Sequence, residues 1–409
     1  RNNNQAFWGE ARYLRSVENV THLLVPGFTH VQLALGVIDY HYNTATDGTP
    51  APYYDNVSLK VYKNLEPSAL MVYPDGSGEY PTIQAAINAA AEQDTVMLAD
   101  GVFTGEGNRD VYFRGKALVL CSQSWDPERC IIDVEGGPGD THRGFVFAYE
   151  EGPGSVVYGI TITGGFMDQT TFNTTYSGGA IYCRAGSSPT ITNCVFRDNS
   201  CLGVDQLGGA IFCDDASPTI SYCVFEGNSA LHGGGLAASD VSSPVVSHCL
   251  FLSNEGITTA SAVYSHDPQA NVTISNCTFY GGIHPGYWGT VVSANHGGLE
   301  IDHSILGFAV NGYAVSATDA ADVHLSCCNI YGNAQGDWYW AIADQFGVEG
   351  NISLDPVFCM GNNTTEPFGI DESSPCSSEN NFECGLIGAY GVGCGEMSGV
   401  GSGEVVQSR

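Results

Sequence analysis

The stretch Gly178–Ser200 reads GGAIYCRAGSSPTITNCVFRDNS, and two close copies of it follow at Gly208–Ser229 and Gly233–Asn254. These copies read GGAIFCDDASPTISYCVFEGNS and GGGLAASDVSSPVVSHCLFLSN. Each copy contains a short β-rich segment, a polar turn that ends in Ser-Pro, a second β-rich segment and then an Asn. Because both segments are bounded by Gly and Pro and are too short for helices, we expect strands. Self-similarity at this interval is typical of stacked supersecondary units.

Three weaker copies continue the pattern at residues 262–282, 291–308 and 314–333. One position can be followed through all the copies in steps of 29, 26, 28, 27 and 24 residues: Cys194, Cys223, Cys249, Cys277, Ser304 and Cys328. A unit of this length buries its apolar side only by stacking on the next unit. Each repeat is therefore predicted to form one coil of a solenoid.

Stacked coils place equivalent residues in ladders with a spacing of about 4.8 Å. Two residues after the Cys position comes a Phe (Phe196, Phe225, Phe251 and Phe279), and an Asn marks the following corner (Asn199, Asn228, Asn254 and Asn333). Cys and Phe are apolar and should stack inside, whereas stacked Asn side chains can satisfy one another's amides. Parallel crossovers are overwhelmingly right-handed. The sequence thus predicts an all-β fold, a right-handed parallel β-helix.

The helical stretch IQAAINAAA lies at residues 83–91 and follows Thr82, which can act as an N-cap. Its apolar positions fall on one face: Ile83, Ala86, Ile87 and Ala90. A short amphipathic helix of this kind can cover the open end of a solenoid. We therefore expect it to be the N-terminal cap of a β-helix that spans residues 66–394, followed by a flexible tail at 395–409.

Residues 1–63 follow a different pattern, in which apolar and polar residues alternate as in half-buried antiparallel strands. This segment ends in DNVSLKVYK and resembles the last strands of jelly-roll domains of the carbohydrate-binding type. A sheet that lacks its first strands would leave open edges. We expect a partial β-sandwich here, and a chain that is part of a longer one.

Charge is distributed unevenly along the chain, whose formal net charge is −31. Every Lys and Arg lies at or before Arg197 except the terminal Arg409. Phosphate binding depends on Lys and Arg, so nucleic acid is not an expected partner. No run of apolar residues is long enough to span a membrane. A solvated extracellular face is the simplest reading of the acids, although they can also collect divalent cations such as calcium.

The chain contains 15 cysteines, which favours an oxidising setting outside the cytoplasm, and hence a secreted or cell-surface location. Those in the ladder, including Cys183 and Cys213, are interpreted as small buried apolar groups. The last four are expected to form disulfides, Cys376 with Cys384 and Cys359 with Cys394. A zinc site is the alternative, but no CxxC pair and no nearby His supports it.

The stretch PDGSGEYPTIQAAINAAAEQDTVMLADGVFTG at residues 74–105 resembles the N-terminal cap and first coil of bacterial β-helix repeat proteins of the pectin-lyase-like superfamily. The phrases GGAIYC, SPTITNCVF and NISLDPVFC fit the same group. The resemblance covers roughly residues 66–394 and implies the β-helix fold. It does not imply one chemistry, because the superfamily includes lyases, hydrolases, epimerases, tailspike-like binders and adhesins.

Candidate catalytic residues follow from what enzymes of this superfamily need. Uronate lyases need a cation or calcium and an Arg or Lys base, and hydrolases need paired Asp residues on one face. Arg143 is the best candidate cation, with Asp133, Asp140 and His142 close in sequence; the structural alternative is a surface loop between coils. The adjacent Asp214 and Asp215 would point to opposite sides of an extended chain and are expected to decorate a turn. The pairs His266-Asp267 and Asp302-His303 receive no catalytic role.

Exposed aromatic rings are the other route to function, because sugar rings stack on Trp and Tyr faces. Two groups fall between repeats: Tyr287 and Trp288, then Trp338, Tyr339 and Trp340. The alternative for the second group is that its rings cover the end of the core.

The leading hypothesis is a secreted or surface-displayed β-helix module that binds or displays towards polysaccharide or a cell-surface glycan, without cofactor or catalysis. The rival is a polysaccharide-degrading lyase or glycoside hydrolase. Two carboxylates and a cation close together on one exposed face would favour the enzyme. Because the later coils carry no cation, a site for an acidic polysaccharide must lie on the coils before Arg197 or recruit calcium.

Overall fold

The computed structural model describes residues 69–168, 177–203, 206–285, 289–318, 320–359 and 368–393. These residues lie in one compact unit that begins at Ala69. The predicted β-sandwich segment at 1–63 and the predicted tail at 395–409 lie outside the described residues.

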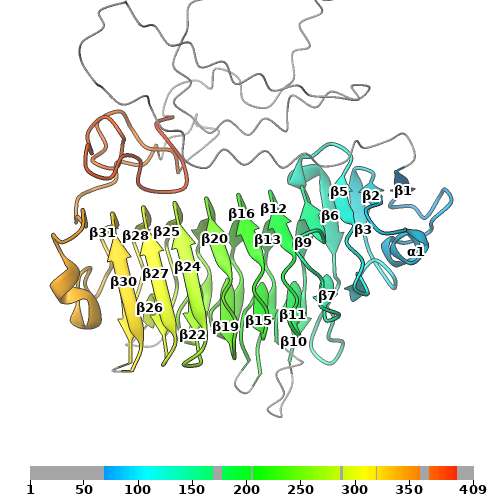
Figure 1. Cartoon of the computed structure of the whole chain (residues 1–409), viewed down its shortest axis with the longest axis horizontal. Coiled ribbons are helices and arrows are strands. Elements are labelled where there is room, and N and C mark those ends of the chain that lie inside the picture. The colour runs from blue at the N-terminus through cyan, green and yellow to red at the C-terminus, as the bar shows by residue number, and fades with distance from the viewer. Residues whose placement is uncertain are drawn as a thin grey trace, which may run out of the picture. The chain divides into compact units, whose positions relative to one another are not determined.

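Strands in the described part form three long parallel sheets and a short fourth one, which together wind into a β-helix (Figure 1). The ten-stranded sheet contains β1 Leu70–Val72, β2 Thr95–Leu98, β5 Val119–Ser122, β8 Val156–Tyr158, β12 Thr190–Thr192, β16 Thr219–Ser221, β20 Val245–Ser247, β24 Asn271–Ser275, β27 Gly298–Asp302 and β30 Asp322–Ser326. The nine-stranded sheet contains β3 Gly101–Phe103, β6 Cys130–Asp133, β9 Thr161–Thr163, β13 Val195–Arg197, β17 Val224–Glu226, β21 Leu250–Leu252, β25 Thr278–Tyr280, β28 Ile305–Gly307 and β31 Asn329–Tyr331.

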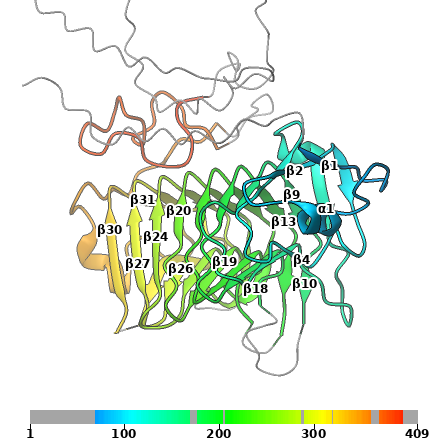
Figure 2. The same ribbon diagram turned by 45° about the vertical axis from the view of Figure 1, so that its right-hand side comes forward.

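The remaining two sheets form the third side of each coil and one of its corners (Figure 2). The eight-stranded sheet contains β4 Val111–Tyr112, β7 Phe145–Phe147, β11 Ile181–Arg184, β15 Ile211–Asp214, β19 Leu236–Ser239, β23 Val263–Ser265, β26 Gly289–Ala294 and β29 Gly312–Ala317. The four-stranded sheet contains β10 Phe166–Met167, β14 Ser200–Cys201, β18 Ser229–His232 and β22 Glu255–Thr259. Consecutive coils therefore pair strand by strand, which confirms the predicted fold class.

The predicted Cys ladder is confirmed. The Cys223 N–H donates to Cys249 Sγ and the Cys249 N–H to Cys277 Sγ, both at 3.4 Å, and the Cys277 N–H donates to Ser304 Oγ at 3.0 Å. All of these side chains are buried. Burial raises the pKa of the Cys223 and Cys249 thiols well above 9.0, so they stay protonated and inert.

The Phe and Asn ladders have the predicted register as well. Phe225 stacks between Phe196 and Phe251 with ring centroids 4.9 and 4.5 Å away. At the corner, Asn228 Oδ1 accepts from the backbone N–H and the amide of Asn199, each at 3.0 Å, and Asn254 Oδ1 does the same for Asn228. Each buried amide is thus satisfied by the neighbouring coil.

The predicted cap is the helix α1, Ile83–Ala89, at the N-terminal end of the β-helix (Figure 1). Thr82 caps it as expected, since its side chain accepts from the Ala85 N–H at 3.2 Å. Lys116 Nζ donates to the carbonyls of Ile87 and Ala90 at 2.7 Å, where the helix leaves unpaired carbonyl groups. At the other end, the short 3-10 helix η4, Trp340–Gln345, packs beside β29 and β30. A further 3-10 turn, η2, spans Pro127–Arg129.

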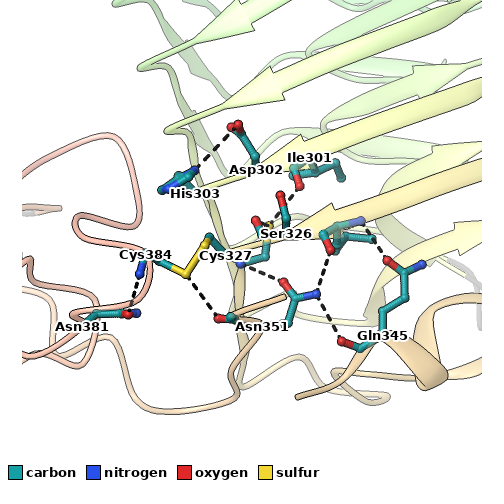
Figure 3. Close-up of a disulfide and its surroundings, with 12 residues drawn as sticks. Ile301, Asp302, His303, Ser326, Cys327, Gln345, Asn351, Asn381 and Cys384 are labelled. Atoms are coloured by element: carbon teal, nitrogen blue, oxygen red, sulfur yellow. Dashed lines mark hydrogen bonds and ion pairs between the residues drawn. A yellow bond between two sulfur atoms is a disulfide. The ribbon is translucent and has the colours of Figure 1, made fainter. Parts of the chain in front are cut away.

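The predicted pairing of Cys376 with Cys384 is wrong. Cys384 forms a disulfide with Cys327 (Figure 3). Cys376 is a free, buried thiol. Cys327 lies at the corner between β30 and β31, and the segment 368–393 folds back against the nine-stranded sheet, where the Gly388 N–H donates to His303 O at 2.7 Å. The fold-back therefore brings Cys384 to a partner 57 residues away in sequence. Cys359 is disulfide-bonded, and its predicted partner Cys394 lies outside the described residues.

Candidate functional site

The predicted charged group at residues 133–143 is brought together only in part. His142 lies between two carboxylates, with Nδ1 against Asp110 Oδ2 and Nε2 at 3.0 Å from Asp140 Oδ1. Asp133 Oδ1 instead accepts from the Glu135 N–H at 3.1 Å. Both ring nitrogens of His142 are therefore engaged within the protein.

Arg143 does not lie in an exposed loop, because only 6% of the residue is accessible to solvent. Its Nη1 donates to Ser177 O at 3.0 Å, and its guanidinium carbon lies 5.1 Å from the centre of the Tyr182 ring. Burial lowers the pKa of Arg143, an effect that neighbouring groups oppose. The Arg143 guanidinium therefore packs against the Tyr182 ring inside the protein and is shielded from a polymer outside.

Aromatic and charged side chains lie together on the outer face of the eight-stranded sheet, and the sequence patterns did not predict that they would be neighbours. On successive strands of this sheet, the following residues pair with one another and point away from the solenoid core: Tyr112, Val146, Tyr182, Phe212, Ala237 and Tyr264. These residues form a second apolar cluster, separate from the solenoid core. The next outward column places Arg184 beside Asp214 on the neighbouring strand.

A cleft of about 340 Å³ opens at the first strands of this sheet and is lined by Tyr112, Arg114 and Tyr149. The two tyrosine rings meet edge to face, with centroids 6.3 Å apart and planes at 72°. Tyr149 is 56% exposed and Arg114 is also exposed. Two rings and a guanidinium thus present stacking surfaces and a fixed positive charge to solvent.

A buried carboxylate fixes both rims of this cleft. Glu151 is 0% exposed, and its two oxygens accept from the Gly115 N–H at 3.0 Å and the Tyr149 N–H at 2.8 Å. Ser187 Oγ on the next coil donates to the same carboxylate at 3.0 Å. Since charge-assisted bonds of this kind are the stronger ones, Glu151 holds Arg114 and Tyr149 in a defined relation.

Arg114 differs from most other Lys and Arg side chains nearby, because their charges are paired or hydrogen-bonded within the protein. Salt bridges neutralise several of them in the described part of the chain: Arg109 with Glu135, Arg129 with Asp100, and Arg197 with Glu128 and Glu226. Backbone carbonyls hold Lys116 and Arg143. Among the described residues the guanidinium of Arg114 has no hydrogen bond and no ion pair. It is therefore free to meet an anionic ligand.

Acidic side chains collect farther along the same face. Tyr182 OH donates to Asp214 Oδ2 at 2.6 Å, so Asp214 does more than decorate a turn. A hydrogen bond with Asp214 raises the pKa of Asp240, and burial and the charges of Asp214, Asp267 and Asp215 act in the same direction. The carboxylates around Asp240 thus disfavour its charged form.

The predicted aromatic contacts have different environments. Trp338 is partly buried against the core and its Nε1 donates to Ile352 O at 3.1 Å, as expected of a ring that covers the end of the solenoid. Tyr339 and Trp340 are 50% and 65% exposed. Tyr287 and Trp288 lie outside the described residues.

Within the described ranges, no three His, Cys, Asp or Glu side chains are grouped so that they could hold a metal ion. In the same residues, no helix has the length and apolar character needed to cross a membrane.

Sequence reasoning missed Tyr112, Arg114, Tyr149 and Glu151. The signal that could have found them is the turn EEGPGS at residues 150–155, which corresponds to the turn RAGSSP at residues 184–189 and precedes β8 as that turn precedes β12. Extending the repeat backwards through this turn would have drawn attention to Tyr149 and Glu151 beside it.

Comparison with known proteins agrees with the topology. Residues 154–353 match the family described as a right handed beta helix region. The search of curated proteins found no match. Among solved structures, pectin methylesterase from carrot is similar at 12% identity with a TM-score of 0.36, over 70% of this chain and 88% of that one. The parallel coils and the family match together identify the fold as a right-handed β-helix.

Proposed function

We propose that this β-helix is a secreted or surface-displayed module that binds an acidic saccharide at the cleft of Tyr112, Arg114 and Tyr149. The observation that carries the proposal is an unpaired guanidinium beside two tyrosine rings, held in place by the buried Glu151 carboxylate. The partner would be a polysaccharide or a cell-surface glycan.

The two rings favour a sugar over other anions. A pyranose presents an apolar C–H face to an aromatic ring and hydroxyl groups at its edge, and tyrosine offers a ring and a hydroxyl to match. The cleft volume of about 340 Å³ lies at the lower end of the range of small-molecule sites. It therefore suits one sugar unit or a chain end, with the rest of the polymer outside.

The charge of Arg114 favours a sugar that carries a carboxylate or sulfate. The chain as a whole repels anions, since its net charge is −31, so an anionic ligand needs a local cation that no protein carboxylate neutralises. Arg114 supplies one on a coil before Arg197, where a site that does not recruit calcium is expected to lie. Guanidinium also matches the planar geometry of a carboxylate.

The test is calorimetric titration of the full chain with hexagalacturonate, hexamannuronate and the neutral cellohexaose. An Arg-to-carboxylate hydrogen bond is worth about 1.5–3 kcal/mol, so Arg114→Gln should weaken binding of the acidic oligosaccharides by about 10- to 150-fold. Tyr149→Ala should weaken it as well, and added salt should weaken the wild type more than Arg114→Gln.

Arg129→Gln is the matched control, because Arg129 is exposed but already paired with Asp100. It should leave binding unchanged. Failure of both acidic probes to bind, or equal binding by wild type and Arg114→Gln, would refute the proposal.

A second candidate is a glycoside hydrolase that uses the Asp214 and Asp240 pair, because these carboxylates lie together beside Arg184 on an exposed face. Retaining and inverting enzymes hold their two carboxyl groups about 5–5.5 Å and about 6.5–9.5 Å apart. Either separation between Asp214 and Asp240 would suit hydrolysis, so enzymatic activity is what distinguishes this candidate from the binding module. Release of reducing ends from polygalacturonate or cellulose that Asp240→Asn abolishes would favour the hydrolase instead.

A further inference from the structure

Two tyrosine rings lie parallel at the far end of the eight-stranded sheet. Tyr313 on β29 and Tyr339 stack with centroids 4.7 Å apart and planes at 11°. Gly336 pairs with Tyr313 through a β-bridge, and its φ of 135° is a backbone conformation that L side chains rarely adopt. This glycine lets the chain turn back so that Tyr339 covers Tyr313.

The next ring, Trp340, is held outward by an unusual backbone. Its φ is 52°, in the left-handed region, which is an outlier for a bulky residue, and the residue is 65% exposed. Strained positions of this kind persist only where the surroundings fix them, and they concentrate at functional sites. A ring whose role was to cover the core would lie inward, as its neighbour Trp338 does.

Trp338 provides the fixed base. Its indole N–H donates to Ile352 O, and its ring contacts Phe346 with centroids 5.8 Å apart. In contrast, the indole N–H of Trp340 and the hydroxyls of Tyr313 and Tyr339 have no hydrogen-bond partner among the described residues. Trp338 is therefore anchored next to these residues in the chain, while the polar groups of Tyr313, Tyr339 and Trp340 remain available to a ligand.

We propose that Tyr313, Tyr339 and Trp340 form a second saccharide-binding site, which takes neutral sugars. Exposed rings offer stacking surfaces to the C–H faces of a pyranose, and the free indole and phenol groups can hydrogen-bond its hydroxyls. We name these three residues the aromatic platform.

The negative charges near the platform favour a neutral sugar over an acidic one. No Lys or Arg occurs between residues 198 and 408, and the nearby carboxylates include Asp337, which accepts from the Asn333 N–H at 2.9 Å, and Asp344. An acidic sugar would meet only like charge here, whereas hydroxyl groups can donate to carboxylates. The platform thus complements a neutral glycan and differs in class from the Arg114 cleft.

The platform is also remote from that cleft. Tyr313 lies on β29 and Tyr112 on β4, the two edge strands of the same eight-stranded sheet. With strands about 4.8 Å apart, seven intervals separate the two sites by about 34 Å. Each site can therefore be lost without the other, and this proposal does not depend on the first.

The experiment is titration of the full chain with the neutral hexasaccharides cellohexaose, maltohexaose and mannohexaose, read by calorimetry and by saturation-transfer NMR. At least one should bind, and Tyr339→Ala and Trp340→Ala should each weaken it about tenfold or more, the equivalent of about 1.4 kcal/mol. Phe382→Ala is the matched control, since Phe382 is 92% exposed and lies outside the platform. Arg114→Gln should leave this binding unchanged.

Trp340→Ala should also keep the thermal midpoint of the wild type, because an exposed ring contributes little burial. Three results would overturn the proposal: no neutral hexasaccharide binds at millimolar concentration, binding survives in both platform variants, or sedimentation shows that Trp340→Ala separates a dimer into monomers. The last result would mean that a second copy of the chain covers the platform.

Discussion

Replacing Phe225 with Ala tests how far the ladder stabilises the solenoid. Phe225 is 0% exposed and has an aromatic neighbour on each side, Phe196 at 4.9 Å and Phe251 at 4.5 Å. Truncating a buried Phe costs about 3–5 kcal/mol through lost burial and the cavity left behind. Two stacked contacts add about 0.5–1.5 kcal/mol each where they are not already counted. We expect a loss of about 3–5 kcal/mol if the stacking is already counted, and of up to about 8 kcal/mol if it is fully additional.

Hydrogen exchange is a suitable assay, because a solenoid can open coil by coil and a single global free energy need not describe it. The slowest amides of β13, β17 and β21 should lose protection by the stated amount, and those of β2 and β5 should change little. Phe382→Ala, at a 92% exposed residue, is the control. A loss below about 2 kcal/mol, or one spread evenly over the coils, would refute this account of the ladder.

Two other predictions concern the C-terminal disulfide and the acidic pair. Cys384→Ser opens a loop of 57 residues, and the loop-entropy relation gives a loss of about 4 kcal/mol in the free energy of unfolding. The variant should unfold at a lower urea concentration, and residues 368–393 should be cleaved faster by protease. Unchanged unfolding would contradict this prediction. Asp240 has a folded-state pKa above its usual 3.8, so its contribution to stability is present at low pH and is lost as pH rises through that pKa. Asp240→Asn should therefore unfold at a higher temperature than wild type at pH 7 and show no advantage near pH 3. A destabilised variant at pH 7 would show that the carboxylates do not repel one another.

The fold was predictable because ladders repeat. Cys223, Phe225 and Asn228 recur on each coil with the same chemistry, and a stack of identical residues can be satisfied only in register. Thr82 identified the capping helix for a similar local reason, since an N-cap acts within its own turn.

The disulfide could not be predicted in this way. Cys376 and Cys384 are close in sequence, but the pairing depends on how residues 368–393 fold back on a distant coil. The chain places Cys327 at that corner, and no repeat pattern marks the return path.

The cleft was missed for a related reason. Tyr112 and Tyr149 belong to neighbouring coils in the early part of the solenoid. The repeat is too weakly conserved from coil to coil there for its register to be predicted from the sequence. Arg143 was the best candidate cation because acids lie close to it in sequence, but its burial follows from the packing of Met167 and Tyr182, which sequence spacing does not reveal.

A crystal structure of the full chain with hexagalacturonate would show directly whether the Arg114 cleft binds an acidic sugar. We expect a sugar ring against Tyr149 and a carboxylate within about 3 Å of the Arg114 guanidinium, the distance of a charge-assisted hydrogen bond. Sugar density over Asp214 and Asp240, or an empty cleft at a saturating concentration of the oligosaccharide, would contradict the account.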